Sequence, residues 1–218
     1  MVHFVGAGPG APDLITLRGA ELLKQADVII YAGSLVNPAL LDMAREDCEI
    51  HNSAKMTLEQ VIDVMKQAEA AGKTTVRLHT GDPCVYGAIR EQMDALDELG
   101  ISYDDVPGVS SFCGAAAALR AEYTLPGVSQ SVIITRLAGR TPVPDAESLS
   151  SMASHGASMA VFLSSGMLGR VQEELLKGAY TEDTPAALVL VGNFLDSPYE
   201  KSKLYDPTFT TEFREASR

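Results

Sequence analysis

Short strand-like runs alternate with longer helix-like segments along this 218-residue chain, which predicts an α/β protein with two α/β domains and mostly parallel sheets. Three observations support this prediction. The strand-like runs are rich in Val and Ile, glycine and proline stand where most of them end, and the alternation restarts after Pro107-Gly108. We therefore expect an N-terminal domain over residues 1–106 and a C-terminal domain over residues 107–218.

The first half carries the clearest local signals. In chain order we expect a strand over 2–5, a turn over 6–13, a helix that ends near 25, a strand over 27–31, a helix from 57, a strand over 74–79, a helix over 86–99 and a strand over 102–106. Thr57 is placed as a helix N-cap, and Gly72 and Gly100 are placed to end the helices before them.

The second half repeats the pattern less regularly. We expect a helix over 110–119, a strand over 131–135, a proline-containing loop over 138–144, a helix over 146–154, a strand over 158–163, a helix over 167–176 and a strand over 186–191. After Val191 the periodicity is lost, and residues 196–207 are typical of a tail laid on the surface.

Composition and charge exclude several classes of function. The formal net charge is −12 and no large cluster of Lys and Arg is present, so a nucleic-acid partner is not expected. No apolar run reaches the length of a membrane span, and strand-like sequence begins at Val2, so we expect a cytoplasmic protein that acts on a small molecule. Cys48, Cys84 and Cys113 are widely spaced without a CxxC pair, which predicts neither a disulfide framework nor a metal site.

The junction Gly81-Asp82-Pro83 is the most informative part of the sequence, because a strand ends in this turn and helix-like sequence follows it. Ligands of α/β proteins bind at the carboxyl ends of strands. Gly81 can adopt a conformation closed to other residues, Asp82 can accept hydrogen bonds from amides or from a ligand hydroxyl, and Pro83 stiffens the turn. The combination predicts a ligand site at this turn.

The loop Gly6-Ala7-Gly8-Pro9-Gly10-Ala11 fits the loose G-x-G-x-x-G/A pattern of dinucleotide sites, so a nicotinamide-dependent oxidoreductase has to be considered. That fingerprint expects an acidic residue at the end of the second strand, and residues 28–33 contain none. Asp27 stands at the opposite end of this strand, and Pro9 removes an amide that a phosphate would need. The dinucleotide hypothesis is therefore disfavoured.

No catalytic side chain can be identified from the sequence. His51, His79 and His155 lie near the ends of predicted elements without a positioned partner, and no nucleophile with its base can be assembled. Ser110 and Ser111 stand where a strand gives way to a helix, so they either contact a ligand or cap the helix. This pattern favours chemistry that depends on positioning.

Five motifs, taken in order, resemble those of the tetrapyrrole methyltransferases: Gly6-Ala7-Gly8-Pro9-Gly10, residues 31–38, Gly81-Asp82-Pro83, residues 107–112 and residues 135–142. The resemblance covers nearly the whole chain. The first and third motifs are general to the family, whereas residues 31–38 and 135–142 point to members that methylate C11 of precorrin-4 or cobalt-precorrin-4 in cobalamin biosynthesis. Another member of the family, acting on uroporphyrinogen III or on a different precorrin, is the nearest alternative.

The resemblance implies a homodimeric two-domain enzyme that binds S-adenosyl-L-methionine in a cleft between its domains and needs no metal. The implied cofactor contacts are Gly81, Asp82, Val85, Tyr86, Ser110 and Ser111 from the first domain and Leu163, Met167, Ala186 and Ala187 from the second. The implied substrate contacts are Pro9, Ser34, Asn37, Arg136 and Arg140, although the two arginines are also compatible with a solvated loop. On this basis Asp82→Ala is expected to weaken cofactor binding far more than folding.

The chain departs from the family pattern after Ala187. The family continues there through a strand, a turn and a further helix, whereas here Ala186-Ala187 runs directly into Leu188-Val189-Leu190-Val191. About thirty residues are missing, more than a parallel crossover needs, so a strand would be lost with its crossover helix. Residues 188–191 could replace the lost strand. This departure raises the alternative of a catalytically impaired binding protein.

Overall fold

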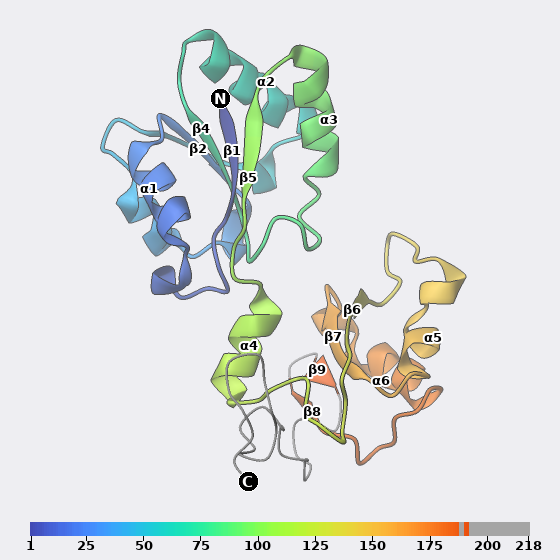
Figure 1. The fold of residues 1–218 in the computed structure, drawn as a ribbon. Helices are drawn as coiled ribbons and strands as arrows, with labels where there is room; N and C mark the ends of the chain where they lie inside the picture. The colour runs from blue at the N-terminus through green and yellow to red at the C-terminus, as the bar shows by residue number, and fades with distance from the viewer. Residues whose placement is uncertain (188–189, 192–218) are drawn as a thin grey trace, which may run out of the picture. The chain divides into compact units, whose positions relative to one another are not determined.

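The computed structural model describes residues 1–187 and 190–191, and the predicted tail over 196–207 lies outside the described residues (Figure 1). The chain divides into two compact units, Met1–Ala115 and Ala116–Arg218, which we call unit 1 and unit 2. This division falls inside helix α4 (Ser111–Leu119). None of the helices in the described part of the chain has the length and apolar character needed to span a bilayer.

Unit 1 is built on a five-stranded parallel sheet with the strand order β3-β2-β4-β1-β5. The strands are β1 (Val2–Gly6), β2 (Val28–Tyr31), β3 (Glu49–Asn52), β4 (Thr75–His79) and β5 (Tyr103–Val106). Strand β3 was not predicted, because Glu49–Asn52 lies at the edge of the sheet and lacks the apolar character of the other strands. The other four strands agree with the sequence prediction within one residue at both ends.

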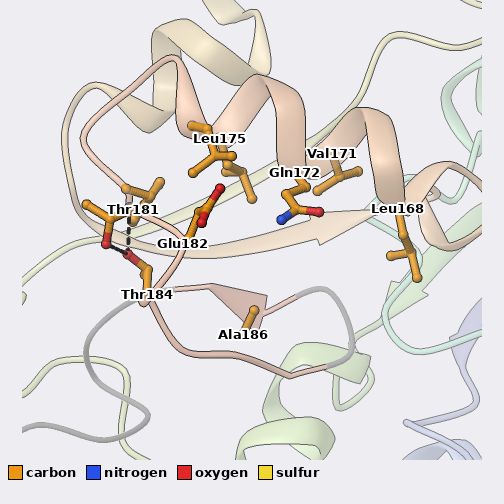
Figure 2. A pocket seen from close by; sticks show the side chains of 10 residues that line it. Leu168, Val171, Gln172, Leu175, Thr181, Glu182, Thr184 and Ala186 are labelled. Atoms are coloured by element: carbon orange, nitrogen blue, oxygen red, sulfur yellow. Dashed lines mark hydrogen bonds between the residues drawn. The ribbon is translucent and has the colours of Figure 1, made fainter.

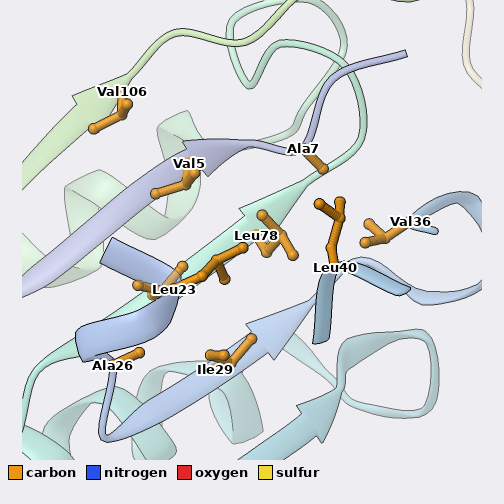
Figure 3. Close-up of a cluster of buried hydrophobic side chains, with 10 residues drawn as sticks. Val5, Ala7, Leu23, Ala26, Ile29, Val36, Leu40, Leu78 and Val106 are labelled. Carbon is orange, nitrogen blue, oxygen red and sulfur yellow. The ribbon is translucent and has the colours of Figure 1, made fainter. Parts of the chain in front are cut away.

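Helices cover both faces of this sheet, and neighbouring strand residues therefore point into two different cores. Val5 and Ile29 pack with Leu23 of α1 (Leu17–Gln25) in one core, which Figure 3 shows. The preceding and following residues on these strands, Phe4 and Ile30, pack on the opposite face against α2 (Leu58–Ala70) and α3 (Arg90–Leu99). All four strand residues are fully buried, which explains why the strands read as continuous apolar runs.

Helix-boundary signals in unit 1 behave as predicted, with one exception. Thr57 and Gln60 form a reciprocal capping box at the start of α2, and Gly72 and Gly100 adopt left-handed conformations after their helices. The helix predicted over 86–99 begins only at Arg90, so that prediction was wrong at its N-terminal end. Residues 85–89 instead form a loop that the tertiary contacts described below hold in place.

Unit 2 contains a four-stranded mixed sheet with the order β6-β7-β9-β8. Its strands are β6 (Val132–Arg136), β7 (Ser158–Phe162), β8 (Ala186–Ala187) and β9 (Leu190–Val191), and its helices are α5 (Leu149–Ala153) and α6 (Leu168–Leu176). Only β6 and β7 pair in parallel, whereas β9 runs antiparallel to both β7 and β8. The single strand predicted over 186–191 is thus wrong, because the chain reverses between β8 and β9.

The core of unit 2 lies between α5, α6 and the sheet. Met159 and Val161 of β7 pack there with Leu149, Val171 and Leu175 from the helices. Tyr180 is buried beside them and donates its hydroxyl hydrogen to the carbonyl of Ala157, and burial raises the pKa of Tyr180 to about 12. This core is smaller than that of unit 1.

Candidate functional site

Three loops of unit 1 leave the carboxyl ends of β4, β1 and β5, which are neighbours in the sheet. Parallel strands bring these ends to one edge, where α/β proteins bind ligands. The β1 and β4 loops are joined by two backbone hydrogen bonds between Gly8 and Gly81, with N···O distances of 3.2 and 3.0 Å. The glycine loop and the Gly-Asp-Pro turn therefore form one structural element.

Glycine is required in these loops because their backbones touch. A Cβ atom on Gly6 would lie 2.5 Å from the Cα of Gly108, and one on Gly108 would lie 2.1 Å from the carbonyl oxygen of Gly81. Gly81 also has a φ of +61°, which favours glycine. Close packing of three strand ends accounts for these glycines without a phosphate.

The carboxylate of Asp82, in the loop after β4, attaches the loop after β5 to this element. Its Oδ2 accepts a hydrogen bond of 2.9 Å from the backbone N–H of Gly108, and its Oδ1 accepts one of 2.9 Å from that of Cys84. Hydrogen bonds to a charged acceptor are stronger than neutral ones. Asp82 therefore has a structural task in addition to any contact with a ligand.

The electrostatic character of this edge is acidic. The loops over 6–16, 80–89 and 107–114 contain no Lys or Arg. Hydrogen bonding of its thiol to Asp82 raises the pKa of Cys84 to about 11, and burial together with the nearby charges of Asp82 and Asp104 raises the pKa of Asp105. A pyrophosphate would find no Lys or Arg on these loops, so their charge favours a neutral or cationic ligand over a phosphate.

The other predicted cofactor contacts of unit 1 lie on or beside the same loops. A Cβ on Gly81 would lie 3.5 Å from the backbone nitrogen of Ser111 and 3.6 Å from the Cα of Ser110, so both serines adjoin the turn. Ser110 is buried, and its carbonyl accepts hydrogen bonds from the first turn of α4. Val85 is half-buried and Tyr86 is 44% exposed, both in the 85–89 loop. The structure therefore brings all six together, while their contact with a cofactor stays a prediction.

Two of the predicted substrate residues in unit 1 have structural partners. Asn37 donates from Nδ2 to the carbonyl of Gly10 at 2.8 Å and accepts at Oδ1 from the N–H of Ala39 at 3.0 Å. The ring of Pro9 packs against Gly114 of α4, where a Cβ would lie 2.5 Å from it. Ser34 lies in the short 3-10 helix Gly33–Leu35. The glycine loop is thus fastened on both sides.

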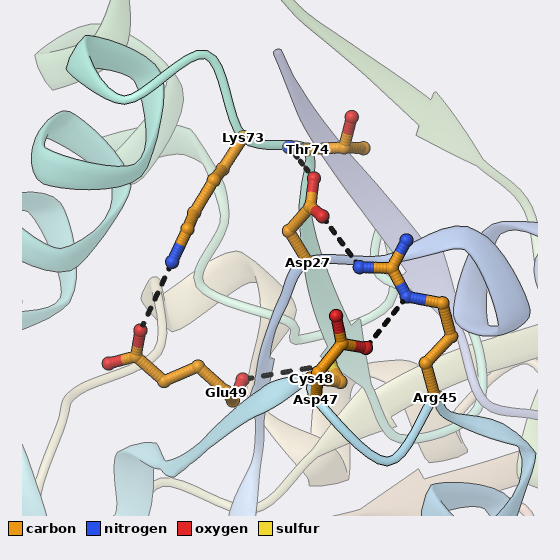
Figure 4. Close-up of polar contacts among 7 residues, drawn as sticks. All are labelled: Asp27, Arg45, Asp47, Cys48, Glu49, Lys73 and Thr74. Atoms are coloured by element: carbon orange, nitrogen blue, oxygen red, sulfur yellow. Dashed lines mark hydrogen bonds and ion pairs between the residues drawn. The ribbon is translucent and has the colours of Figure 1, made fainter.

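Asp27 is the acidic residue next to the start of the second strand, and its carboxylate is hydrogen-bonded to Thr74 and Arg45 (Figure 4). Its carboxylate accepts from the N–H of Thr74 at 2.8 Å and from Arg45 at 2.7 Å, and these hydrogen bonds lower its pKa. This network ties β2 to β4 at the amino edge of the sheet, the edge opposite the loops described above. The position of Asp27 is incompatible with the ribose contact of a dinucleotide site.

The predicted cofactor residues of unit 2 follow β7 and form β8. Leu163 has a φ of +53° and a side chain that is 67% exposed. The next residue, Ser164, accepts from the N–H of Leu137 at 3.0 Å and donates to the carbonyl of Phe162 at 2.7 Å, which fixes the turn. Ala186 is exposed and Ala187 half-buried. These residues present apolar surface at the ends of β7 and β8.

Met167 belongs to a small cluster with the loop after β6. Its Cε lies 3.6 Å from the position of a Cβ on Gly139, and Arg170 donates to its sulfur at 3.6 Å and to the carbonyl of Ala138 at 3.3 Å. These contacts couple the start of α6 to the loop that carries the predicted substrate arginines. They give Met167 a packing role within unit 2.

The two arginines of this loop differ in their surroundings. Arg136 donates to the carbonyl oxygens of Thr141 at 3.1 Å and Pro142 at 2.7 Å, so its guanidinium closes its own loop. Arg140 is exposed, and no hydrogen bond or ion pair within the described residues involves it. Of the two, Arg140 is the one whose donors are available to a carboxylate.

A pocket of about 250 Å³ lies in unit 2 between α6 and the segment that leads into β8 (Figure 2). Leu168, Val171 and Leu175 line one side, and Thr181, Glu182, Thr184 and Ala186 line the other. Leu163, Met167 and Ala187 are not among its lining residues. The pocket is therefore a different place from the predicted cofactor wall and shares only Ala186 with it.

Several residues that shape the site are not among the predicted contacts. Gly108 and Gly6 are essential to the approach of the three loops, and Gln92 and Arg77 form a buried polar pair beneath the 85–89 loop. A glycine that ends a strand is a local signal for the first two. No local signal identifies the Arg77 and Gln92 pair, because their contact depends on the packing of α3 against β4.

The chain is similar to known proteins over the whole of its described part. Residues 1–191 match the family model of tetrapyrrole (corrin/porphyrin) methylases. The chain is 46% identical to a cobalt-precorrin-4 C(11)-methyltransferase of Methanocaldococcus jannaschii, over 100% of this chain and 97% of that protein. That alignment runs over 251 positions, 33 more than the 218 residues present here, so the relative carries residues that this chain lacks.

Two solved structures share the fold. The X-ray structure of a cobalt precorrin-4 methyltransferase, a cobalamin biosynthetic enzyme, has a TM-score of 0.81 at 46% identity and covers 84% of this chain and 77% of that one. A uroporphyrin-III C-methyltransferase from Thermus thermophilus, complexed with S-adenosylhomocysteine, has a TM-score of 0.70 at 29% identity, covering 84% and 78%.

Proposed function

The chain belongs to the family of tetrapyrrole (corrin/porphyrin) methylases, and we propose that it is a methyltransferase that uses S-adenosyl-L-methionine to methylate C11 of precorrin-4 or cobalt-precorrin-4 in cobalamin biosynthesis. The observation that carries this proposal is the 46% identity over the whole chain to a cobalt-precorrin-4 C(11)-methyltransferase. The acidic, glycine-lined loop edge of unit 1 supports the choice of cofactor. We further propose a cytoplasmic homodimer.

The residues present fit this cofactor. S-adenosylmethionine carries its methyl group on a positively charged sulfonium, which is already activated for transfer to carbon. Loops without Lys or Arg, with the carboxylates of Asp82 and Asp105 nearby, suit such a cation better than they suit a phosphate. The turn at Gly81 and the start of α4 at Ser111 offer backbone groups for the nucleoside. We assign Leu163, Met167, Ala186 and Ala187 to the apolar side of the cofactor site.

The protein contributes positioning and exclusion of water. Because the donor is activated by its own charge, holding donor and acceptor at near-attack distance supplies much of the barrier reduction. The three fused loops of unit 1 provide a rigid support for this purpose, since their backbones cannot move apart without breaking the hydrogen bonds of Asp82 and Gly8. No side chain has to act as a nucleophile.

We assign recognition of the acidic tetrapyrrole to the loops that carry Arg140, Asn37 and Pro9. Arg140 is the residue free to form a forked hydrogen bond with a propionate or acetate side chain. Arg136 supports this role by closing the loop through Thr141 and Pro142. Asn37 shapes the glycine loop through Gly10.

The missing residues favour one second candidate, a binding protein with impaired catalysis. The relative from M. jannaschii is longer by about the number of residues that the sequence analysis found absent after Ala187. The antiparallel strands β8 and β9, each two residues long, form one edge of the sheet of unit 2. Cofactor binding without turnover would identify this candidate.

The test is incubation with precorrin-4 or cobalt-precorrin-4 and methyl-labelled S-adenosylmethionine, followed by mass spectrometry of the product. We expect one labelled methyl group at C11, and we expect calorimetric binding of S-adenosylhomocysteine but not of NAD. Uroporphyrinogen III serves as the alternative acceptor, and its exclusive labelling would assign the chain to the other branch of the family. Binding of NAD without S-adenosylhomocysteine would overturn the proposal.

A further inference from the structure

The 85–89 loop connects the Gly-Asp-Pro turn to α3, and it holds two of the four non-glycine residues with positive φ in the described chain. Tyr86 has a φ of 58° and Ala88 one of 50°. The loop folds back so closely that a Cβ on Gly87 would lie 2.0 Å from the carbonyl oxygen of Pro83. Such conformations persist only where the surroundings determine them.

Gln92, on the first turns of α3, holds this loop through its side-chain amide. Its Nε2 donates to the carbonyl of Ala88 at 2.9 Å, and its Oε1 accepts from Nε of Arg77 at 2.9 Å. A guanidinium can only donate, so the amide oxygen has to face Arg77 and the amide nitrogen has to face Ala88. The orientation of the amide is fixed by chemistry.

Arg77 anchors the amide to the sheet. It lies on β4, donates from Nη1 to the carbonyl of Ile30 on β2 at 3.1 Å, and is only 6% exposed. Gln92 is 5% exposed, and none of the ion pairs within the described residues includes Arg77. Burial lowers the pKa of Arg77 to about 10, so the group remains charged at neutral pH. The contacts run without a break from β2 through Arg77 and Gln92 to Ala88.

We propose that Gln92 is a positioning residue for cofactor binding. Its side-chain amide joins the buried guanidinium of Arg77 to the carbonyl of Ala88 and thereby fixes the conformation of the 85–89 loop. This inference rests on the proposed function, because Val85 and Tyr86 of this loop are the residues assigned to the cofactor. Gln92 itself is buried beneath the loop, and it acts on the cofactor site through the backbone of the loop.

Gln92→Glu separates this role from a purely structural one. The carboxylate keeps an acceptor for Arg77 and adds an opposite charge, so α3 stays attached to β4. It also places an oxygen against the carbonyl of Ala88, so the bond to the loop is lost and replaced by repulsion. The substitution is thus expected to keep or raise the stability of the fold and to weaken the attachment of the 85–89 loop.

The experiment measures binding of S-adenosylhomocysteine by calorimetry, thermal unfolding of the unliganded protein, and the methyl-transfer kinetics of wild type and variants. For Gln92→Glu we expect an unfolding temperature at or above that of the wild type and a dissociation constant raised about tenfold. The KM for the cofactor should rise by a similar factor, with kcat at saturating cofactor within about twofold. Gln67→Glu, on the exposed face of α2, makes the same chemical change away from the loop and should leave binding unchanged.

Two outcomes overturn the inference. Gln92→Glu that folds and binds with the wild-type dissociation constant shows that the loop does not depend on the amide. A wild-type protein that does not bind S-adenosylhomocysteine overturns the proposed function and this inference with it, so the two failures are distinguishable. If the glutamate variant does not fold, Gln92→Met, which keeps the length of the side chain and removes both hydrogen bonds, decides the question by the same binding measurement.

Discussion

Unit 1 and unit 2 are both α/β units, but their sheets differ in the direction and the length of their strands. The interior strands are buried to a similar degree, since all five residues of β4 and four of the five residues of β7 are buried. All neighbours in the first sheet are parallel, and the second ends in an antiparallel hairpin of two-residue strands. The loops at the carboxyl edge of unit 1 are fastened by glycine contacts and by Asp82, whereas Leu163, a predicted cofactor contact of unit 2, is 67% exposed.

The difference shows that the predicted cofactor contacts of unit 1 and those of unit 2 are held in place in different ways. In unit 1 the backbone geometry is set by close packing before any ligand arrives, which reduces the cost of binding. In unit 2 the predicted contacts are apolar side chains that remain accessible in the described structure. Substitutions of Gly6, Gly108 and Asp82 in unit 1 should therefore affect folding and binding together.

The largest effect is expected from Gly108→Ala. The new Cβ would lie 2.1 Å from the carbonyl oxygen of Gly81 and close to the backbone of Gly6, so the loops would have to separate. We expect a loss of about 3 kcal/mol in the free energy of unfolding, together with loss of cofactor binding. Urea unfolding followed by far-ultraviolet circular dichroism measures the first effect.

Gly169→Ala in unit 2 is the matched control for this substitution. Apart from its chain neighbours and the backbone of its own helix, no atom lies within 4 Å of its added Cβ, and the residue is exposed in α6. We expect stabilisation by about 0.5 kcal/mol, because alanine favours the helix. Equal destabilisation by both substitutions would contradict the difference we draw between the units.

The second effect is a loss of stability in acid that originates at His79. This side chain is 4% exposed with no hydrogen-bond partner at Nε2, and burial with the nearby charge of Arg77 lowers its pKa from 6.5 to about 3. The unfolded chain therefore binds a proton first as pH falls. The stability that this group contributes is complete above pH 6.5 and is lost progressively as the pH falls toward about 3.

Urea midpoints of the wild type and of His79→Leu between pH 7 and pH 4 test this prediction. Leucine fills a similar volume beside Phe4 and cannot titrate. The variant should lose less stability than the wild type over this interval. Parallel pH curves for the two proteins would show that His79 does not contribute.

Asp82→Ala should have the third-largest effect. It removes the acceptor for the N–H groups of Gly108 and Cys84, which should cost about 2 kcal/mol of stability. From the sequence we expect cofactor binding to weaken far more than folding, and these two hydrogen bonds add a folding cost to that expectation. Binding of S-adenosylhomocysteine should also weaken, since the turn loses its attachment to the β5 loop.

The same variant has a chemical readout at Cys84. Without Asp82 the thiol pKa should fall from about 11 toward its ordinary range, so the thiolate fraction at pH 8 increases. Alkylation by iodoacetamide, followed by mass spectrometry of the Cys84 peptide, should be faster than in the wild type. Cys113, which is also exposed, serves as the internal reference. Unchanged reactivity of Cys84 would contradict the contact.

The smallest effect concerns the two arginines of unit 2. Arg140→Gln should raise the KM for the tetrapyrrole by about tenfold with no change in stability, because its guanidinium has no partner within the described residues. Arg136→Gln removes the donors to Thr141 and Pro142 and should lower kcat/KM by loosening the loop. Steady-state kinetics with each variant distinguish the two roles. Equal effects on KM and stability would show that both arginines serve the loop.

The elements of unit 1 could be predicted largely from local sequence. The apolar runs of β1, β2 and β4, the capping box at Thr57 and the glycines after α2 and α3 carry their own signals, since each depends on residues adjacent in the chain. The strand β3 and the start of α3 could not be predicted. The first depends on a neighbouring strand, and the second on a loop held by contacts across the fold.

The sequence by itself determined the alternation of strands and helices, the Gly81-Asp82-Pro83 turn at the carboxyl edge of the sheet, where a ligand site is predicted, and the resemblance to one family of enzymes. Only the tertiary structure decided that Gly6, Gly81 and Gly108 share one point of contact, that Asp82 joins two loops, and that Arg136 and Arg140 play different parts. The reason is physical. Propensity and capping act between near neighbours in the chain, whereas the environment of a side chain depends on segments that folding brings together.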